Sequence, residues 1–134
     1  MHILSVYENG GIWLVPAVVV ENISKRYHTI DGEVPALENV SFEVYEGEFI
    51  GIVGPSGCGK STLLSIIAGL IEPSSGQVSV FGEKVTGVNP RIGYMLQRDS
   101  LFEWRTIYKN VILGLEIQNQ VTPERLQHVE YLLD

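Results

Sequence analysis

The sequence has little cysteine, little basic charge and no long apolar run. A single cysteine cannot form an internal disulfide, and its three histidines lack metal-ligand spacing, which argues against a structural zinc site. Nine Lys and Arg residues stand against sixteen Asp and Glu residues, so a nucleic-acid groove binder is disfavoured. The longest apolar run, residues 12–20, is interrupted by Pro16 and is too short for a membrane span. No basic residue precedes the first apolar residues, so we expect no secretory signal and a cytoplasmic location.

The composition that remains is that of one globular domain, with 45% hydrophobic residues in 134. Residues 1–16, punctuated by Gly10-Gly11 and Pro16, predict an irregular leader, and residues 17–134 are expected to form the domain. Short β-branched or alternating segments predict strands at 17–23, 40–45, 48–53, 77–81 and 91–96, with loop-like residues through Asp31-Gly32 and Pro35. The segment 48–53 is apolar on both faces, which is typical of a strand in the interior of a sheet.

Helices are predicted where apolar residues recur at a spacing of three and four. Leu63, Ile66, Ile67, Leu70 and Ile71 form one such stripe, and Tyr108, Val111, Ile112 and Leu115 form another. Thr106 is the expected N-cap of the second helix. A third helix is predicted to open at Thr122-Pro123-Glu124, with a capping residue, a proline at the first helical position and an early acid.

A phosphate-binding loop is predicted between the apolar strand and the first helix. The run Gly54-Pro55-Ser56-Gly57-Cys58-Gly59-Lys60-Ser61-Thr62 fits the pattern G-x-x-x-x-G-K-[ST] in the context that the motif requires. Its glycines let backbone N–H groups face one anion, and the helix N-terminus adds partial positive charge. Lys60 is expected to reach the β- and γ-phosphates, and the Ser61 hydroxyl to coordinate Mg²⁺. A net-acidic chain can thus hold a polyanion locally.

With this loop in place, the chain resembles the ATP-binding subunits of ABC transporters over roughly residues 18–134. Tyr27 lies where that family keeps an aromatic residue that stacks on adenine, and the segment 70–76 resembles the one that closes the Walker A helix. Gln97, in Gly-Tyr-Met-Leu-Gln, resembles the Q-loop glutamine, which contacts Mg²⁺ and the attacking water. The segment 101–118 is similar to importer ATPases for nitrate, sulfonates and taurine, although Glu103 stands where those usually have proline.

The resemblance implies an α/β fold: the core of a P-loop NTPase of the ABC type, with N-terminal antiparallel strands and the start of a helical subdomain. It also implies ATP and Mg²⁺ as ligands, and Ser61 and Gln97 as metal-binding residues. The expected partners are a membrane permease, contacted through the Gln97–Val111 region, and a second full-length subunit, with no nucleic acid. The implied location is the cytoplasmic face of the cell membrane.

The family's C-terminal motifs are not found within these 134 residues, which resemble only its first half. Asp134 follows an apolar triplet but lies on helical spacing, so it does not resemble the Walker B aspartate. Two hypotheses follow: the N-terminal half of an importer's ATP-binding subunit, or a fragment that binds nucleotide without hydrolysing it. A GTPase or nucleoside kinase is disfavoured, because neither Asn-Lys-x-Asp nor Asp-x-x-Gly occurs.

The same resemblance indicates how stable and how active residues 1–134 are expected to be on their own. The strand that ends in the Walker B aspartate is a neighbour of the phosphate-loop strand in the family, so the segment 48–53 is expected to have an unpaired edge here. Unpaired apolar edges promote aggregation. We therefore expect low stability and no steady ATP turnover from residues 1–134 alone.

Overall fold

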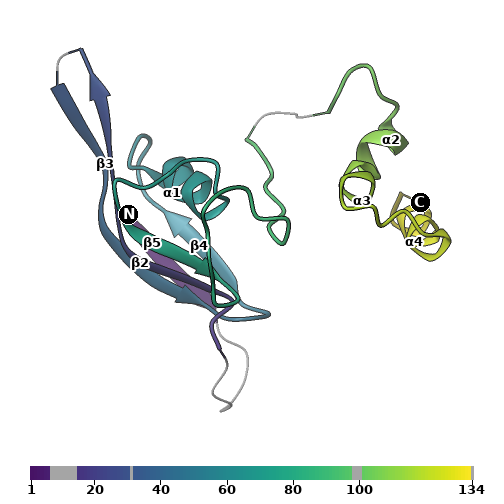
Figure 1. Cartoon of the computed structure of the whole chain (residues 1–134), viewed down its shortest axis with the longest axis horizontal. Helices are drawn as coiled ribbons and strands as arrows, with labels where there is room; N and C mark the ends of the chain where they lie inside the picture. Colours follow the sequence, from purple (N-terminus) through teal and green to yellow (C-terminus); the bar gives the residue numbers. More distant parts are fainter. Residues whose placement is uncertain (7–14, 31, 98–100, 134) are drawn as a thin grey trace. The chain divides into compact units, whose positions relative to one another are not determined.

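The computed structural model describes residues 1–6, 15–30, 32–97 and 101–133. It divides into two compact units, Met1–Ile92 and Gly93–Asp134. Within the described residues, the first unit contains two sheets and one helix, and the second contains three short helices; Figure 1 labels these elements. Residues 7–14, Asp31, residues 98–100 and Asp134 lie outside the described part of the chain.

A four-stranded antiparallel sheet forms the larger part of the first unit. Its strands are β2 (Val18–Thr29), β3 (Gly32–Val44), β5 (Ser75–Val80) and β6 (Glu83–Lys84), in the order β3-β2-β5-β6. The alternation predicted for 40–45 is confirmed in β3, where Val40, Phe42 and Val44 are half-buried while Ser41 and Glu43 are exposed. In this part of β3, one face of the strand is therefore apolar and half-buried and the other is polar and exposed, as the period-two pattern predicts.

The hairpin of β2 and β3 is longer than the sequence analysis predicts. Strand β2 continues to Thr29, which pairs with Gly32, and Pro35 pairs with Arg26 inside β3. The prediction of loop-like residues through Pro35 is therefore wrong for the described residues. Proline is accommodated because β3 is an edge strand, where a missing N–H need not interrupt the ladder.

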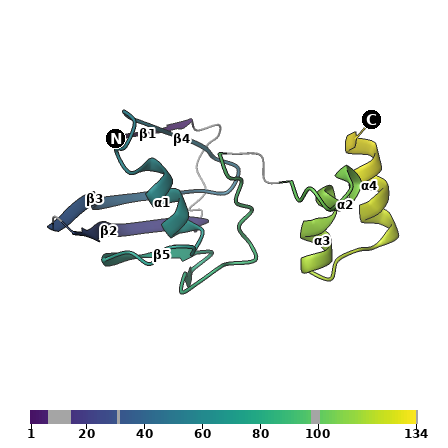
Figure 2. The same cartoon turned by 90° about the horizontal axis from the view of Figure 1, so that it is seen from above.

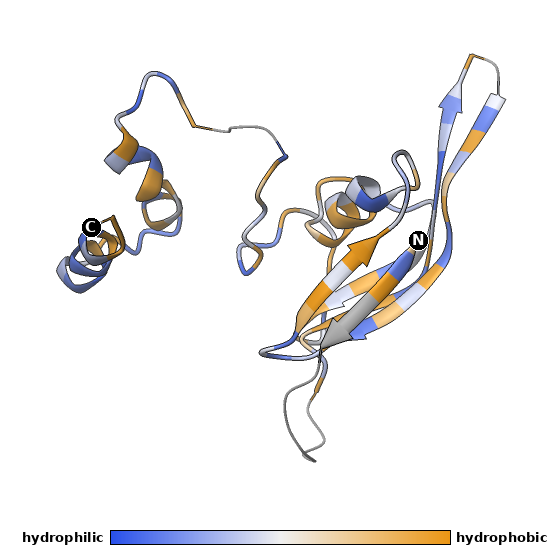
Figure 3. Ribbon diagram, turned by 180° about the vertical axis from the view of Figure 1, so that it is seen from behind, coloured by the Kyte–Doolittle hydropathy of each residue, from blue (hydrophilic) through white to orange (hydrophobic). Residues whose placement is uncertain are grey.

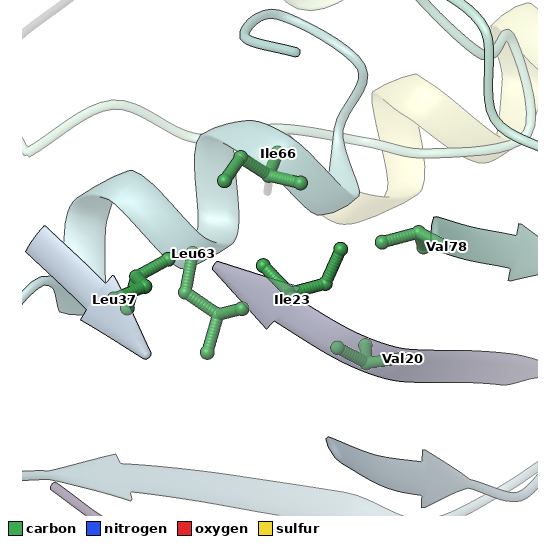
Figure 4. Close-up of a cluster of buried hydrophobic side chains, with 6 residues drawn as sticks. All are labelled: Val20, Ile23, Leu37, Leu63, Ile66 and Val78. Atoms are coloured by element: carbon green, nitrogen blue, oxygen red, sulfur yellow. The ribbon is translucent and has the colours of Figure 1, made fainter. Parts of the chain in front are cut away.

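Helix α1 (Lys60–Ile67) packs its apolar stripe on this sheet. Leu63 and Ile66 are buried and join residues from three strands, Val20, Ile23, Leu37 and Val78, in the core cluster drawn in Figure 4. The helix ends in a Schellman motif at Gly69: the Gly69 N–H donates to the Ile66 carbonyl, and the Leu70 N–H donates to the Ser65 carbonyl. The stripe is confirmed at its centre, whereas Leu70 is exposed because the helix has already ended.

The phosphate-loop strand belongs to a separate two-stranded sheet. Strand β1 (His2–Val6) pairs antiparallel with β4 (Phe49–Val53), with His2 opposite Val53. In Figure 2, α1 lies between this sheet and the four-stranded one, and Ile52 of β4 packs against the core cluster. The prediction of an irregular leader over 1–16 is therefore wrong for residues 2–6, which form a strand.

Within the described part of the chain, strand β4 does not lie in the interior of a sheet, contrary to what its apolar sequence predicts. Figure 3 shows β4 as largely hydrophobic, yet Phe49 is 78% exposed and Val53 is 48% exposed. Among the described residues β4 pairs only with β1, so it lies at the edge of a sheet and not in its interior. One edge of β4 is paired with β1, and the other is unpaired among the described residues, which agrees with the unpaired edge expected for the segment 48–53.

The predicted strand at 91–96 is not formed. These residues begin in a turn, in which the Ile92 N–H donates to the Asn89 carbonyl, and none of them pairs with a strand among the described residues. A strand depends on a ladder partner, and local alternation cannot supply one.

The second unit contains α2 (Ile107–Val111), α3 (Leu113–Ile117) and α4 (Pro123–Leu133). Thr106 caps α2 by accepting a hydrogen bond from the Lys109 N–H, as predicted. Thr122 likewise accepts from the Arg125 N–H at the start of α4, at a long 3.4 Å. None of the helices in the described ranges has the length and hydropathy needed to cross a bilayer.

Candidate functional site: a phosphate-binding loop with an aromatic neighbour

The loop between β4 and α1 is shaped by glycines in the left-handed region. Gly57 has φ 79° and Gly59 has φ 90°, a conformation that residues with a Cβ rarely adopt. At Gly59 space is limiting as well, because a Cβ there would lie 2.4 Å from the Ala36 carbonyl oxygen of β3. The loop therefore passes close to the four-stranded sheet immediately before the chain enters α1.

Lys60 folds back over this loop. Its ammonium donates hydrogen bonds of 2.8 Å to the carbonyls of both Gly54 and Pro55, and it lies 3.7 Å from the Cys58 sulfur. The positive charge is thus held over the loop itself, where the motif predicts that phosphate oxygens bind. An incoming polyphosphate would offer this ammonium charged oxygen partners in place of neutral carbonyls, and charged partners make the stronger hydrogen bonds.

The first turn of α1 presents groups that fit a phosphate and a hard cation. Gly59 is the N-cap and supplies no side-chain hydrogen bond, so the amides of this turn are not capped by the residue before the helix. Ser61 is exposed in the same turn, and its hydroxyl is an oxygen donor of the kind that Mg²⁺ accepts. Elsewhere in the described residues no cluster of three or more His, Cys, Asp or Glu side chains could hold a metal ion.

Tyr27 is brought to this turn by the fold. The Tyr27 hydroxyl lies 3.5 Å from the Thr62 hydroxyl of α1, although the two residues are 35 positions apart in the sequence. The side chain remains 39% exposed. Three register shifts interrupt the pairing of β2 with β3 between Val20 and Arg26, just before Tyr27. The predicted aromatic residue thus lies beside the last residue of the predicted phosphate loop.

Gln97 belongs to the second unit. It is exposed and follows the irregular segment that replaces the predicted strand. Within the Gln97–Val111 region, residues 98–100 lie outside the described part of the chain. Gln97 as a metal-binding residue and this region as a permease contact therefore stay predictions.

The described part of that region is held together by Asn110. Its side-chain amide donates to the carbonyls of Phe102, Arg105 and Thr106, while its side-chain oxygen accepts from the Phe102 N–H at 2.8 Å. Trp104, on the loop so fixed, is 81% exposed. Sequence reasoning did not identify Asn110 as the residue that fixes this loop, since its partners become visible only in three dimensions.

The sequence pattern also did not identify Lys25 and Ser74 as neighbours of the Tyr27 segment. The Lys25 ammonium lies 5.4 Å from the centre of the Tyr27 ring, and the Ser74 hydroxyl accepts a hydrogen bond from the Arg26 N–H. The spacing of Lys25 and Tyr27, two positions apart on a strand, is a signal that places both on one face. Nothing in the sequence indicates that Ser74 reaches this strand.

Three relatives show what the chain is similar to. It is 48% identical over 105 residues to the uncharacterized ABC transporter ATP-binding protein YtlC of Bacillus subtilis, covering 78% of this chain and 40% of that protein. It is 43% identical to the taurine import ATP-binding protein TauB of Ruegeria pomeroyi, covering 86% and 43%. It is 38% identical to the nitrate transport protein NasD of Klebsiella oxytoca, covering 89% and 47%. The chain thus spans less than half the length of these relatives.

A solved structure supports the same assignment. The ATP-binding cassette in a dimeric post-hydrolysis state bound to ADP and Pi superposes with a TM-score of 0.68 at 30% identity, covering 83% of this chain and 53% of that one. The fold is therefore that of part of an ABC ATPase cassette, with its P-loop NTPase core, as predicted. The family model described as ABC transporter matches residues 37–133, from within β3 to the end of α4. The chain belongs to the ABC transporter family.

Proposed function

We propose that this chain is part of the ATP-binding subunit of an ABC importer and that the loop 54–62 binds the phosphates of Mg-ATP. The observation that carries the proposal is the contact between Tyr27 and Thr62 at 3.5 Å, which sets an exposed aromatic ring beside the phosphate loop. A nucleotide needs both parts, one for its base and one for its phosphates. A glycine turn whose only role was to cap α1 would not require an exposed aromatic side chain such as Tyr27 beside it.

The roles of the residues follow from their chemistry. Backbone amides of the loop and of the first turn of α1 bind phosphate oxygens, and Lys60 exchanges its two carbonyl partners for the terminal phosphates. Ser61 would supply an oxygen ligand to Mg²⁺, which when bound neutralises part of the phosphate charge. Tyr27 supplies the face on which adenine stacks.

The wider assignment rests on the relatives. YtlC is named as an ATP-binding protein, TauB as a taurine import ATP-binding protein and NasD as a nitrate transport protein. We extend to this chain the import of a small anionic or zwitterionic solute, a permease partner at the inner face of the membrane, and pairing with a second subunit. The exposed Trp104 loop in the Gln97–Val111 region is the surface assigned to the permease.

The test of nucleotide binding is calorimetry with Mg-ATP on the chain and on Lys60→Ala. Removal of the ammonium loses a charge-assisted contact of roughly 1.5–3 kcal/mol, so the affinity should fall tenfold or more. Lys84→Ala, at an exposed position in β6, is the matched control and should bind as the unaltered chain does. Equal affinity in Lys60→Ala and the unaltered chain would refute the phosphate-loop assignment.

A further inference from the structure

Lys25 is held in place over the ring of Tyr27. Its ammonium lies 5.4 Å from the ring centre, within the range of a cation–π interaction, and it donates a hydrogen bond of 2.7 Å to the Glu72 carbonyl. A surface lysine ordinarily samples many rotamers, whereas this one has two fixed partners. One face of the aromatic ring is therefore covered by a positioned positive charge.

The strand around Tyr27 is also tied to the segment that follows α1. The Ser74 N–H donates to the Ser24 carbonyl at 2.8 Å, and the Arg26 N–H donates to the Ser74 hydroxyl at 3.0 Å. With the bond from Lys25 to Glu72, three contacts connect residues 24–26 to residues 72–74. The ring is thus supported from its strand, from its covered face and, through Thr62, at its hydroxyl.

Building on the proposed function, we propose that Lys25 is a positioning residue for base recognition and that it makes Tyr27 a one-sided platform for a purine. The ammonium excludes the base from the face it covers. It also draws the π electrons of the ring toward itself, which reduces their repulsion with the electron-rich π system of a purine stacked on the opposite face. Lys25 contacts neither base nor phosphate in this arrangement and acts through the ring.

The experiment compares Mg-ATP with Mg-tripolyphosphate, which has the phosphates without a base. In the unaltered chain ATP should bind more tightly than tripolyphosphate, and the ratio of the two affinities measures the contribution of the base. Lys25→Met keeps the apolar stem and removes the charge. It should weaken ATP about two- to tenfold and leave tripolyphosphate unchanged.

Two further variants test the mechanism, and a third serves as the control. Lys25→Arg keeps a cation over the ring and should preserve the ratio of affinities. In a Tyr27→Ala background, Lys25→Met should cause no further loss of ATP affinity, because the ring through which it acts is gone. Lys84→Met, which removes an exposed charge elsewhere in the unit, should alter neither ligand.

The outcomes separate this proposal from the proposed function. An equal loss of ATP and tripolyphosphate in Lys25→Met would overturn it, since that pattern indicates general attraction of phosphate or a damaged fold. An additive loss in the Tyr27→Ala background, or a lost ratio in Lys25→Arg, would overturn it as well. If the unaltered chain bound both ligands equally, the base platform would be rejected and the phosphate loop retained. Binding of neither ligand would reject both.

Discussion

The ammonium of Lys60 lies 3.7 Å from the sulfur of Cys58, inside the loop where phosphates are proposed to bind. Cys58 is half-buried and is the one cysteine of the sequence, so its chemistry can be followed without interference from other thiols. The pair therefore offers a direct reporter of loop occupancy.

Mg-ATP should protect Cys58 from a maleimide reagent. At a nucleotide concentration about ten times the Kd, roughly one tenth of the sites are free, so labelling should slow about tenfold. The rate is followed by mass spectrometry, with Mg²⁺ alone as the control. The Lys60→Ala variant, whose Kd should be at least tenfold higher, should be protected no more than about twofold at the same nucleotide concentration. Identical rates with and without nucleotide would count against binding at this loop.

Substitutions of Tyr27 should rank by the π-face that they retain. Tyr27→Phe loses only the long contact with Thr62, so ATP affinity should change by less than about threefold. Tyr27→Trp should also bind better than Tyr27→Ala, which loses a stacking interaction of about 1–3 kcal/mol, or roughly 5- to 150-fold in affinity. Calorimetry gives the order, and a Phe variant weaker than the Ala variant would refute stacking.

Residue spacing over a few positions predicted the buried face of α1 and two helix caps correctly. The interval between Leu63 and Ile66 fixes which face of α1 is buried, and both residues are indeed in the core. The caps at Thr106 and Thr122 are likewise local, because each hydrogen bond reaches only three residues along the chain. For the same reason the glycine-rich run could be predicted to be the loop that joins β4 to α1.

Pairing between residues far apart in the sequence accounts for the places where the observed fold differs from the predicted one. No turn or capping residue next to His2–Val6 indicates a strand in the sequence. The segment forms a strand because it pairs with β4, which lies more than forty residues later. The segment 91–96 has the composition of a strand but no partner among the described residues. The position of Lys25 relative to Glu72 likewise depends on how β2 meets the turn before β5.

Gly59→Ala should destabilise the chain through two separable effects. The substituted Cβ would occupy a left-handed conformation and would approach the Ala36 carbonyl to 2.4 Å. Gly47→Ala is the matched control, since Gly47 has φ 78° with no atom within 4 Å of its added Cβ. We expect Gly59→Ala to cost about 1–3 kcal/mol more than Gly47→Ala in chemical denaturation, which is the range for a forced steric contact. Similar costs for the two variants would show that the loop does not pack against β3 as described.

Deletion of residues 2–6 should promote aggregation. These residues form β1, the partner of β4 among the described residues, so their removal exposes a second edge of an apolar strand on which Phe49 is already exposed. An unpaired apolar edge is a template for pairing with other chains. Light scattering during a thermal ramp should show an earlier onset than in the unaltered chain. The control is Ser5→Thr, which leaves the backbone ladder of β1 intact, and its onset should not move. If the deletion left both scattering and the unfolding midpoint unchanged, β1 would contribute nothing to the protection of β4.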